Sequence, residues 1–120
     1  MERALFEYLN NNMTSVAVYY LKAPDNAGFP RVVFIPISEN RQHDTEFRRT
    51  RTQISIWDPD RYNGLALREE IYSHLQRFKG IMEGERVCYI NADAQQVFYE
   101  AEIRAYYYAI DFLITYIGEQ

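Results

Sequence analysis

Residues 105–117 read AYYYAIDFLITYI, and their two-residue alternation predicts one long β-strand. One face of this strand would carry large apolar and aromatic side chains: Tyr108, Ile110, Phe112, Ile114 and Tyr116. The opposite face would carry a mixed set: Tyr107, Ala109, Asp111, Leu113, Thr115 and Ile117. A strand with two fairly apolar faces is typical of the centre of a sheet, or of a strand whose outer face meets a partner.

A second long strand is predicted over residues 47–57, where side chains also alternate between two faces. The face that we assign to the core consists of Thr50, Thr52, Ile54 and Ile56. The other face consists of Arg49, Arg51, Gln53, Ser55 and Trp57. This second face is the first candidate for function.

Two helices are expected. Residues 2–10 place apolar side chains at helical spacing. A second helix should begin at Asp58 and Pro59, because an N-cap carboxylate followed by proline is a common helix start, and should run to about Phe78. Its buried stripe would consist of Leu67, Ile71, Leu75 and Phe78.

Shorter strands are predicted at residues 16–20, 32–37 and 86–90. Pro36 has no amide hydrogen for a ladder, so its strand should lie at an edge or be bulged there. Residues 39–46 are polar and are expected to form a loop or a hairpin tip. Residues 92–104 are ambiguous, and their first part, residues 92–96, fits either a turn or a short helical piece.

This order of elements predicts a single α+β domain over residues 1–120. We expect a mostly antiparallel sheet of four to five strands, with two helices packed on one face. The face that carries Arg49 and Trp57 would then be available to a partner.

Composition restricts the class of protein. The net charge of -4 argues against a general nucleic-acid coat, which needs surplus Lys and Arg, although a local basic patch is compatible with it. The single cysteine, Cys88, cannot form an internal disulfide, which suits a reducing compartment. The first residues lack the apolar core of a signal peptide, and no apolar stretch is long enough for a membrane span.

The search for chemistry finds no catalytic, cofactor or metal site. His74 lies one helical turn from Glu70, but such a pair binds metal only with further ligands, and a solvated pair is the simpler interpretation. Cys88 has no identifiable base, and the glycines occur singly rather than in a phosphate-binding loop. We therefore expect no enzyme activity and no cofactor.

The densest feature is a group of arginines in the second long strand. Arg49 and Arg51 would share a face with Gln53 and Trp57, and such a face suits carboxylates, phosphates or a partner subunit. A solvated strand balanced by nearby acidic residues explains the same pattern equally well.

The last strand extends this candidate surface, since its outer face is rich in apolar and aromatic side chains. The tyrosines at 106–108 fit either core packing with sheet coverage or an aromatic anchor for assembly. The candidate assembly interface comprises Arg49, Arg51, Gln53, Trp57, Tyr107, Leu113 and Ile117.

Several segments together resemble the tail completion family of long-tailed phages and prophages, also called tail terminator or tail-to-head joining proteins. The segments are GFPRVVF at 28–34, RTQISIW at 51–57, YNGLAL at 62–67 and AIDF at 109–112. The resemblance spans nearly the whole chain. It departs from the family pattern before the last strand, where residues 99–102 replace a turn with Pro and Gly.

The resemblance implies a virion tail protein, present in the host cytoplasm during assembly. Its subunits would form a ring, a homo-hexamer, at the head-proximal end of the tail tube. That ring would stop tube growth and present a surface to the head–tail connector protein, so its partners would be other copies of itself, the tail tube protein and the connector. A ring needs two different patches on each subunit. No cofactor and no membrane contact are implied, and the isolated subunit can be a monomer.

Other interpretations stay open. A different neck or minor structural component would use the same scaffold. A small-ligand-binding α+β domain would need a pocket with convergent polar groups, for which Asp111, Tyr107 and Arg51 are candidates. Contact with nucleic acid through Arg48, Arg49 and Arg51, with Trp57 stacking on a base, would fit DNA that passes through a ring lumen.

Overall fold

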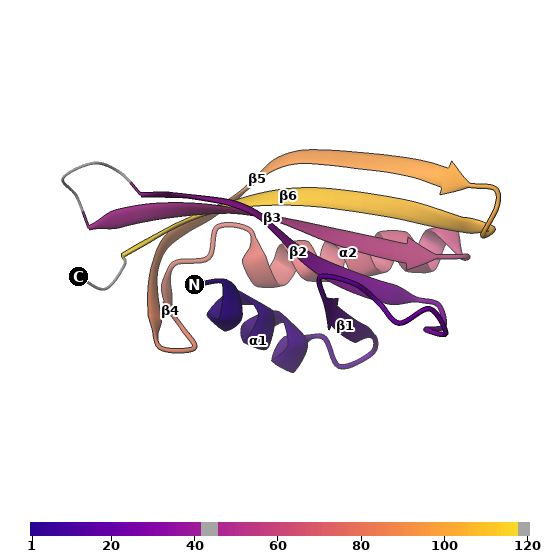
Figure 1. Cartoon of the computed structure of the whole chain (residues 1–120), viewed down its shortest axis with the longest axis horizontal. Helices are drawn as coiled ribbons and strands as arrows, with labels where there is room; N and C mark the ends of the chain where they lie inside the picture. Colours follow the sequence, from indigo (N-terminus) through magenta and orange to yellow (C-terminus); the bar gives the residue numbers. More distant parts are fainter. Residues whose placement is uncertain (42–45, 118–120) are drawn as a thin grey trace.

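The centre of the sheet is the antiparallel pair β3 (Phe47–Asp58) and β6 (Ala105–Ile117). Their register runs without a shift from the Phe47–Ile117 pair to the Asp58–Tyr106 pair. The computed structural model describes residues 1–41 and 46–117 (Figure 1). The other elements in these ranges are α1 (Glu2–Asn12), β1 (Ala17–Tyr20), β2 (Arg31–Arg41), α2 (Arg61–Leu75), β4 (Gly80–Met82) and β5 (Glu85–Glu100).

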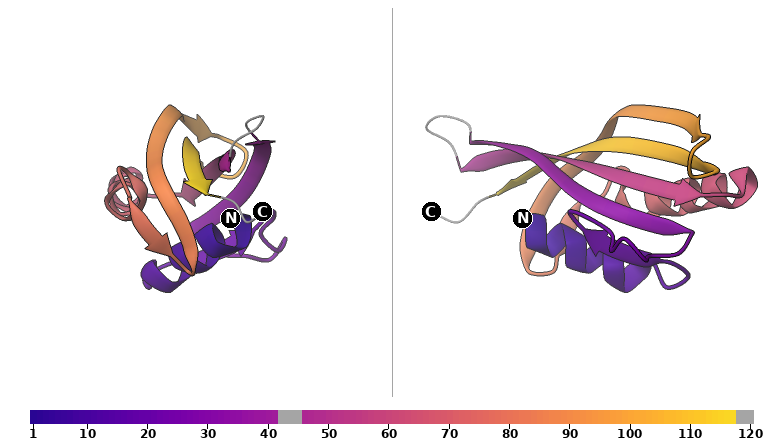
Figure 2. Two further views of the ribbon diagram at one scale, coloured as in Figure 1. Left: turned by 90° about the vertical axis from the view of Figure 1, so that its left-hand side faces the viewer. Right: turned by 45° about the vertical axis from the view of Figure 1, so that its right-hand side comes forward.

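The strands form one six-stranded sheet in the order β1-β2-β3-β6-β5-β4, with α1 and α2 on the same side of it (Figures 1 and 2). The prediction of an α+β fold with both helices on one face is therefore confirmed. The expected sheet of four to five mostly antiparallel strands is corrected to six strands and a mixed sheet, because β1 runs parallel to β2. The sequence did not predict β4, because three residues are too few to show an alternation of apolar and polar side chains. The sequence also did not predict the direction of β1, because that direction depends on the path of residues 21–30 between β1 and β2.

Residues 92–104 differ most from expectation. Neither a turn nor a helical piece forms at their start, because β5 continues to Glu100 and pairs with β6 over its whole length. The stretch Asn91–Gln96 is poor in strand-forming residues, so the long partner β6 imposes the strand on it. Register shifts around Cys88 and Asp93 are bulges in this strand.

The two predicted helices are present with adjusted ends. α1 buries Ala4, Leu5 and Leu9, as its apolar spacing predicts. α2 begins later than expected because Asp58 ends β3 and is buried, and Asp60 is the N-cap instead. Its carboxylate accepts hydrogen bonds from the backbone amides of Tyr62 and Asn63, at 2.9 and 3.3 Å. The helix ends at Leu75 rather than near Phe78.

The hairpin between β2 and β3 is longer than expected. Residues 39–41 of the predicted loop belong to β2, whereas residues 42–45 lie outside the described part of the chain. The expected bulge at Pro36 is confirmed, because the register shifts between Pro36 and Ser38.

The core lies between the helices and the inner face of the sheet. The faces of β3 and β6 assigned to it are buried: Thr50, Thr52, Ile54, Ile56, Tyr108, Ile110, Phe112, Ile114 and Tyr116. Val32 and Phe34 of β2 and Ile71 and Leu75 of α2 pack into the same cluster. The two strand patterns therefore predicted correctly which side of the sheet faces the helices.

Gly64 allows α2 to lie directly on the centre of the sheet. A Cβ at this position would lie 2.5 Å from Cε2 of Tyr108, whose side chain is fully buried. The Tyr108 hydroxyl donates a 3.0 Å hydrogen bond to the carbonyl of Arg61 in the first turn of α2. The ring is therefore fixed at both ends and cannot move away from an added methyl group.

We predict that Gly64→Ala destabilises the protein by about 1–3 kcal/mol, because overpacking against Tyr108 outweighs the better helix propensity of alanine. The measurement is the free energy of unfolding from urea titration. Ala66→Gly, at an exposed position of the same helix, is the control and should cost about 1 kcal/mol by propensity alone. A stabilising Gly64→Ala would contradict the close contact.

Candidate assembly surface

The face of the sheet opposite the helices, here called the outer face, is not covered by any helix of the described chain (Figures 1 and 2). The register of β3 and β6 places all seven predicted interface residues on it, in facing rows such as Trp57 with Tyr107 and Arg51 with Leu113. None of the seven is buried: Arg49, Arg51, Gln53, Trp57, Tyr107, Leu113 and Ile117. The structure thus brings the predicted residues together on one open surface.

Three aromatic side chains form a row across one end of the outer face. Trp57 of β3 lies 4.2 Å from Tyr107 of β6, and Tyr107 lies 4.7 Å from Phe98 of β5, measured between ring centroids. The row exists because the register aligns these residues on adjacent strands. The sequence interpretation missed Phe98, since its segment did not look like a strand. The Tyr107 hydroxyl also shares a 3.1 Å hydrogen bond with the Ser55 hydroxyl.

Arg51 lies between two carboxylates, one on each of two neighbouring strands. Its Nη2 atom is 2.6 Å from Asp93 Oδ2, and its Nη1 atom is 3.4 Å from Asp111 Oδ2. The β5 bulge between Ala92 and Ala94 places Asp93 on this face. The hydrogen bond with Asp93 raises the pKa of the Arg51 guanidinium above its ordinary value, and the charges of Asp93 and Asp111 add to the rise.

The predicted pair of arginines therefore divides into two kinds. Arg51 has its charge matched by Asp93 and Asp111, so it orders three strands and offers little free charge to a ligand. Arg49 is exposed and makes no side-chain ion pair with the described residues. Arg48 is half-buried, and the alternation along β3 assigns it to the opposite face of the strand. Arg48, Arg49 and Arg51 therefore do not converge into one phosphate-binding group.

The residues considered for chemistry in the sequence lie apart from one another in the described chain, or make contacts other than those suggested. No group of three or more His, Cys, Asp or Glu side chains lies close enough to hold a metal ion there. Cys88 is a free, half-exposed thiol, and the His74 carbonyl accepts a hydrogen bond from Tyr8. Of the polar trio suggested for a ligand pocket, Arg51 and Asp111 contact each other, whereas Tyr107 bonds to Ser55 instead. Among the described helices, none has the length and apolar character needed to cross a membrane.

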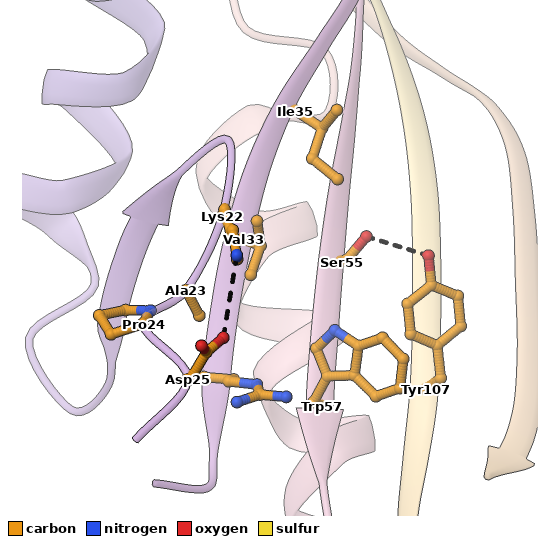
Figure 3. A pocket seen from close by; sticks show the side chains of 10 residues that line it. Lys22, Ala23, Pro24, Asp25, Val33, Ile35, Ser55, Trp57 and Tyr107 are labelled. Carbon is orange, nitrogen blue, oxygen red and sulfur yellow. Dashed lines mark hydrogen bonds and ion pairs between the residues drawn. The ribbon is translucent and has the colours of Figure 1, made fainter. Parts of the chain in front are cut away.

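A cavity of about 350 Å³ opens beside the aromatic row (Figure 3). Residues 22–25 form one wall, and the outer faces of β2, β3 and β6 form the others. Sequence reasoning did not find this cavity, because the loop that closes it meets the sheet only in the folded chain.

No protein-family model matches this sequence, and no curated protein matches it. The fold is similar to a chain in a solved structure described as the virion of a native gene transfer agent (GTA) particle, with a TM-score of 0.75. The superposition covers 98% of this chain and 95% of that chain, at 12% sequence identity. At this identity the likeness shows a shared fold.

We predict that Arg51→Ala lowers the melting temperature more than Arg49→Ala does. Removal of Arg51 leaves Asp93 and Asp111 on the same face without the cation between them, whereas Arg49 has no carboxylate to leave behind. The difference should shrink as salt rises, because mobile ions screen the repulsion between the two carboxylates. Calorimetry at low and high salt checks this, and equal melting temperatures at low salt would show that Arg51 has no structural role.

Proposed function

We propose that this chain is a structural subunit of the tail of a phage-like particle. It forms a homo-hexameric ring at the head-proximal end of the tail tube, where it ends tube growth and joins the tail to the head–tail connector protein. The observation that carries the proposal is the likeness of fold, over nearly the whole of both chains, to a chain of a gene transfer agent virion. The resemblance in local sequence to tail completion proteins supports the more specific role.

The outer face supplies one of the two patches that a ring requires. An aromatic row lies at one end of this face and a charged cluster lies further along the same strands, which suits a contact surface between protein subunits. Such a face is open in the single subunit and would be covered by a neighbour, the tail tube or the connector.

The edge of β5 supplies the second patch. Within the described sheet, β4 pairs only with residues 85–87 of β5, and no strand lies beside the rest of its outer edge. Gln76 and Arg77 bond to the backbone of Ala92 and Ile90, so the edge is open beyond them, over residues 93–100. Val97, Phe98 and Tyr99 on this stretch are exposed. An open edge with exposed apolar side chains is prone to pair with another chain. Two different patches on one subunit give head-to-tail contacts, and these form a ring when the rotation from one subunit to the next closes on itself.

The described residues give less support to the other functions considered for this fold. A different neck component would share the fold and would be distinguished by its position in the particle. Contact with DNA in the ring lumen would depend on Arg49, since Arg51 is matched by two carboxylates. The virion tail is the proposed location, with the host cytoplasm as the place of assembly.

The direct test is electron microscopy and native mass spectrometry of the purified chain, alone and mixed with the tail tube protein of the same particle. We expect six-membered rings in one of the two samples, and rings at one end of the tubes in the mixture. A monomer in both samples, with tubes of uncontrolled length, would refute the proposal.

A substitution on the outer face tests which surface assembles. Leu113→Glu should abolish rings, because it replaces an apolar side chain of the contact with a charged one, yet the monomer should fold because Leu113 lies on the outer face and is not buried. The control is Tyr62→Glu on α2, where the side chain is 82% exposed and lies on the helical side. Circular dichroism checks folding in both variants. Normal rings from Leu113→Glu would place the interface elsewhere.

A further inference from the structure

The cavity beside the aromatic row has an arginine whose charge is not neutralised. Arg31, the first residue of β2, is part of its lining. The rest of the lining consists of Trp57, Val33, Ile35, Ser55, Tyr107 and the loop residues 22–25 (Figure 3). The volume of about 350 Å³ lies within the range of about 300–1,000 Å³ that is usual for sites of small ligands.

Most hydrogen-bond donors of the Arg31 guanidinium are unused. Its Nη1 atom makes one long bond, 3.4 Å, to the carbonyl of Ala27, and its Nε atom is buried without a partner. No carboxylate of the described chain forms an ion pair with it. The one acidic residue in the lining, Asp25, has a side chain that is 97% exposed and pairs with Lys22 at 3.8 Å. The net positive charge of the lining therefore resides on Arg31.

Aromatic rings hold this guanidinium in place. Its central carbon lies 4.7 Å from the ring centre of Phe29 and 5.9 Å from that of Trp57. Such cation–π contacts fix the plane of the group while leaving its edge donors free. The indole nitrogen of Trp57 is a further donor without a partner among the described residues. The Ser55 and Tyr107 hydroxyls bond to each other and complete a wall that is otherwise apolar.

We propose that this cavity binds a carboxylate attached to an apolar group. The carboxylate pairs with the donors of Arg31, and the apolar part lies on Trp57, Val33 and Ile35. A single guanidinium with apolar walls fits one negative charge, because a carboxylate matches the planar fork of arginine. A phosphate chain fits less well, since it needs several cations and would meet a protein with a net charge of -4. The ligand is either a small organic acid or an acidic side chain of a protein partner.

Trp57 is the only tryptophan of the chain, so its fluorescence reports directly on this cavity. We would titrate the protein with 3-phenylpropionate and, as the neutral counterpart, with 3-phenylpropionamide. We would also titrate it with a blocked Ala-Glu-Phe-Ala peptide and its Ala-Gln-Phe-Ala counterpart. The acid of at least one pair should bind saturably and at least about tenfold more tightly than its amide.

The two pairs distinguish the source of the carboxylate. Binding of 3-phenylpropionate alone indicates a small organic acid, and binding of the glutamate peptide indicates a protein segment. Failure of both acids to bind, equal binding of acids and amides, or tighter binding of inorganic phosphate or a short oligonucleotide would overturn the proposal.

Substitutions of Arg31 test whether the acid binds in this cavity. Arg31→Gln should weaken binding of the acid about tenfold or more, because it removes the charge and the fork of donors. Arg86→Gln, at an exposed arginine outside both the lining and the candidate interface, is the matched control and should bind like the parent. Arg31→Lys keeps the charge and provides a second comparison if Arg31→Gln folds poorly. It should also bind more weakly, since an ammonium cannot make the two parallel bonds. Unchanged binding by a folded Arg31 variant would refute the site.

Discussion

The antiparallel register of β3 and β6 is the constraint on which the rest of the structure depends. It runs without a bulge along both strands and fixes which side chains meet the helices. Ile54 and Ile110 face the core as a pair, whereas Trp57 and Tyr107 face outward as a pair. A slip of one residue would exchange these faces, exposing the core set and burying Arg51. The same pairing thus holds the hydrophobic core together and assembles the outer face.

The strands on either side of this pair adapt to it through bulges. On β5, the shift at Asp93 brings a carboxylate to Arg51, which is already paired with Asp111 from β6. On β2, the shift after Pro36 lets a strand with a missing amide hydrogen stay in the ladder. These local irregularities decide where charge on the outer face is matched and where it is free. As a result, Arg51 acts within the subunit. Arg31, at the start of β2, keeps most of its donors unused.

The candidate surface could be predicted in part, because strand alternation assigns residues to faces. It put Arg51, Trp57 and Leu113 on one face without any knowledge of the fold. It could not show that Asp93 neutralises Arg51, since that contact joins residues from strands far apart in the chain. The sequence analysis did not identify Phe98 or Arg31 as site residues for the same reason. Each of them gains its role from a contact with a residue on another strand.

The sequence by itself determined the α+β class, the two helices and the inward faces of β3 and β6, because these follow from periodicities within single segments. Tertiary structure alone decided that residues 92–100 form a strand, that β1 runs parallel to β2 and that a cavity opens beside Trp57. The physical reason is that each of these features depends on free energy gained between segments. A polar stretch such as Asn91–Gln96 has little intrinsic preference for helix or strand. It becomes a strand because the backbone amides and carbonyls of β6 need hydrogen-bond partners.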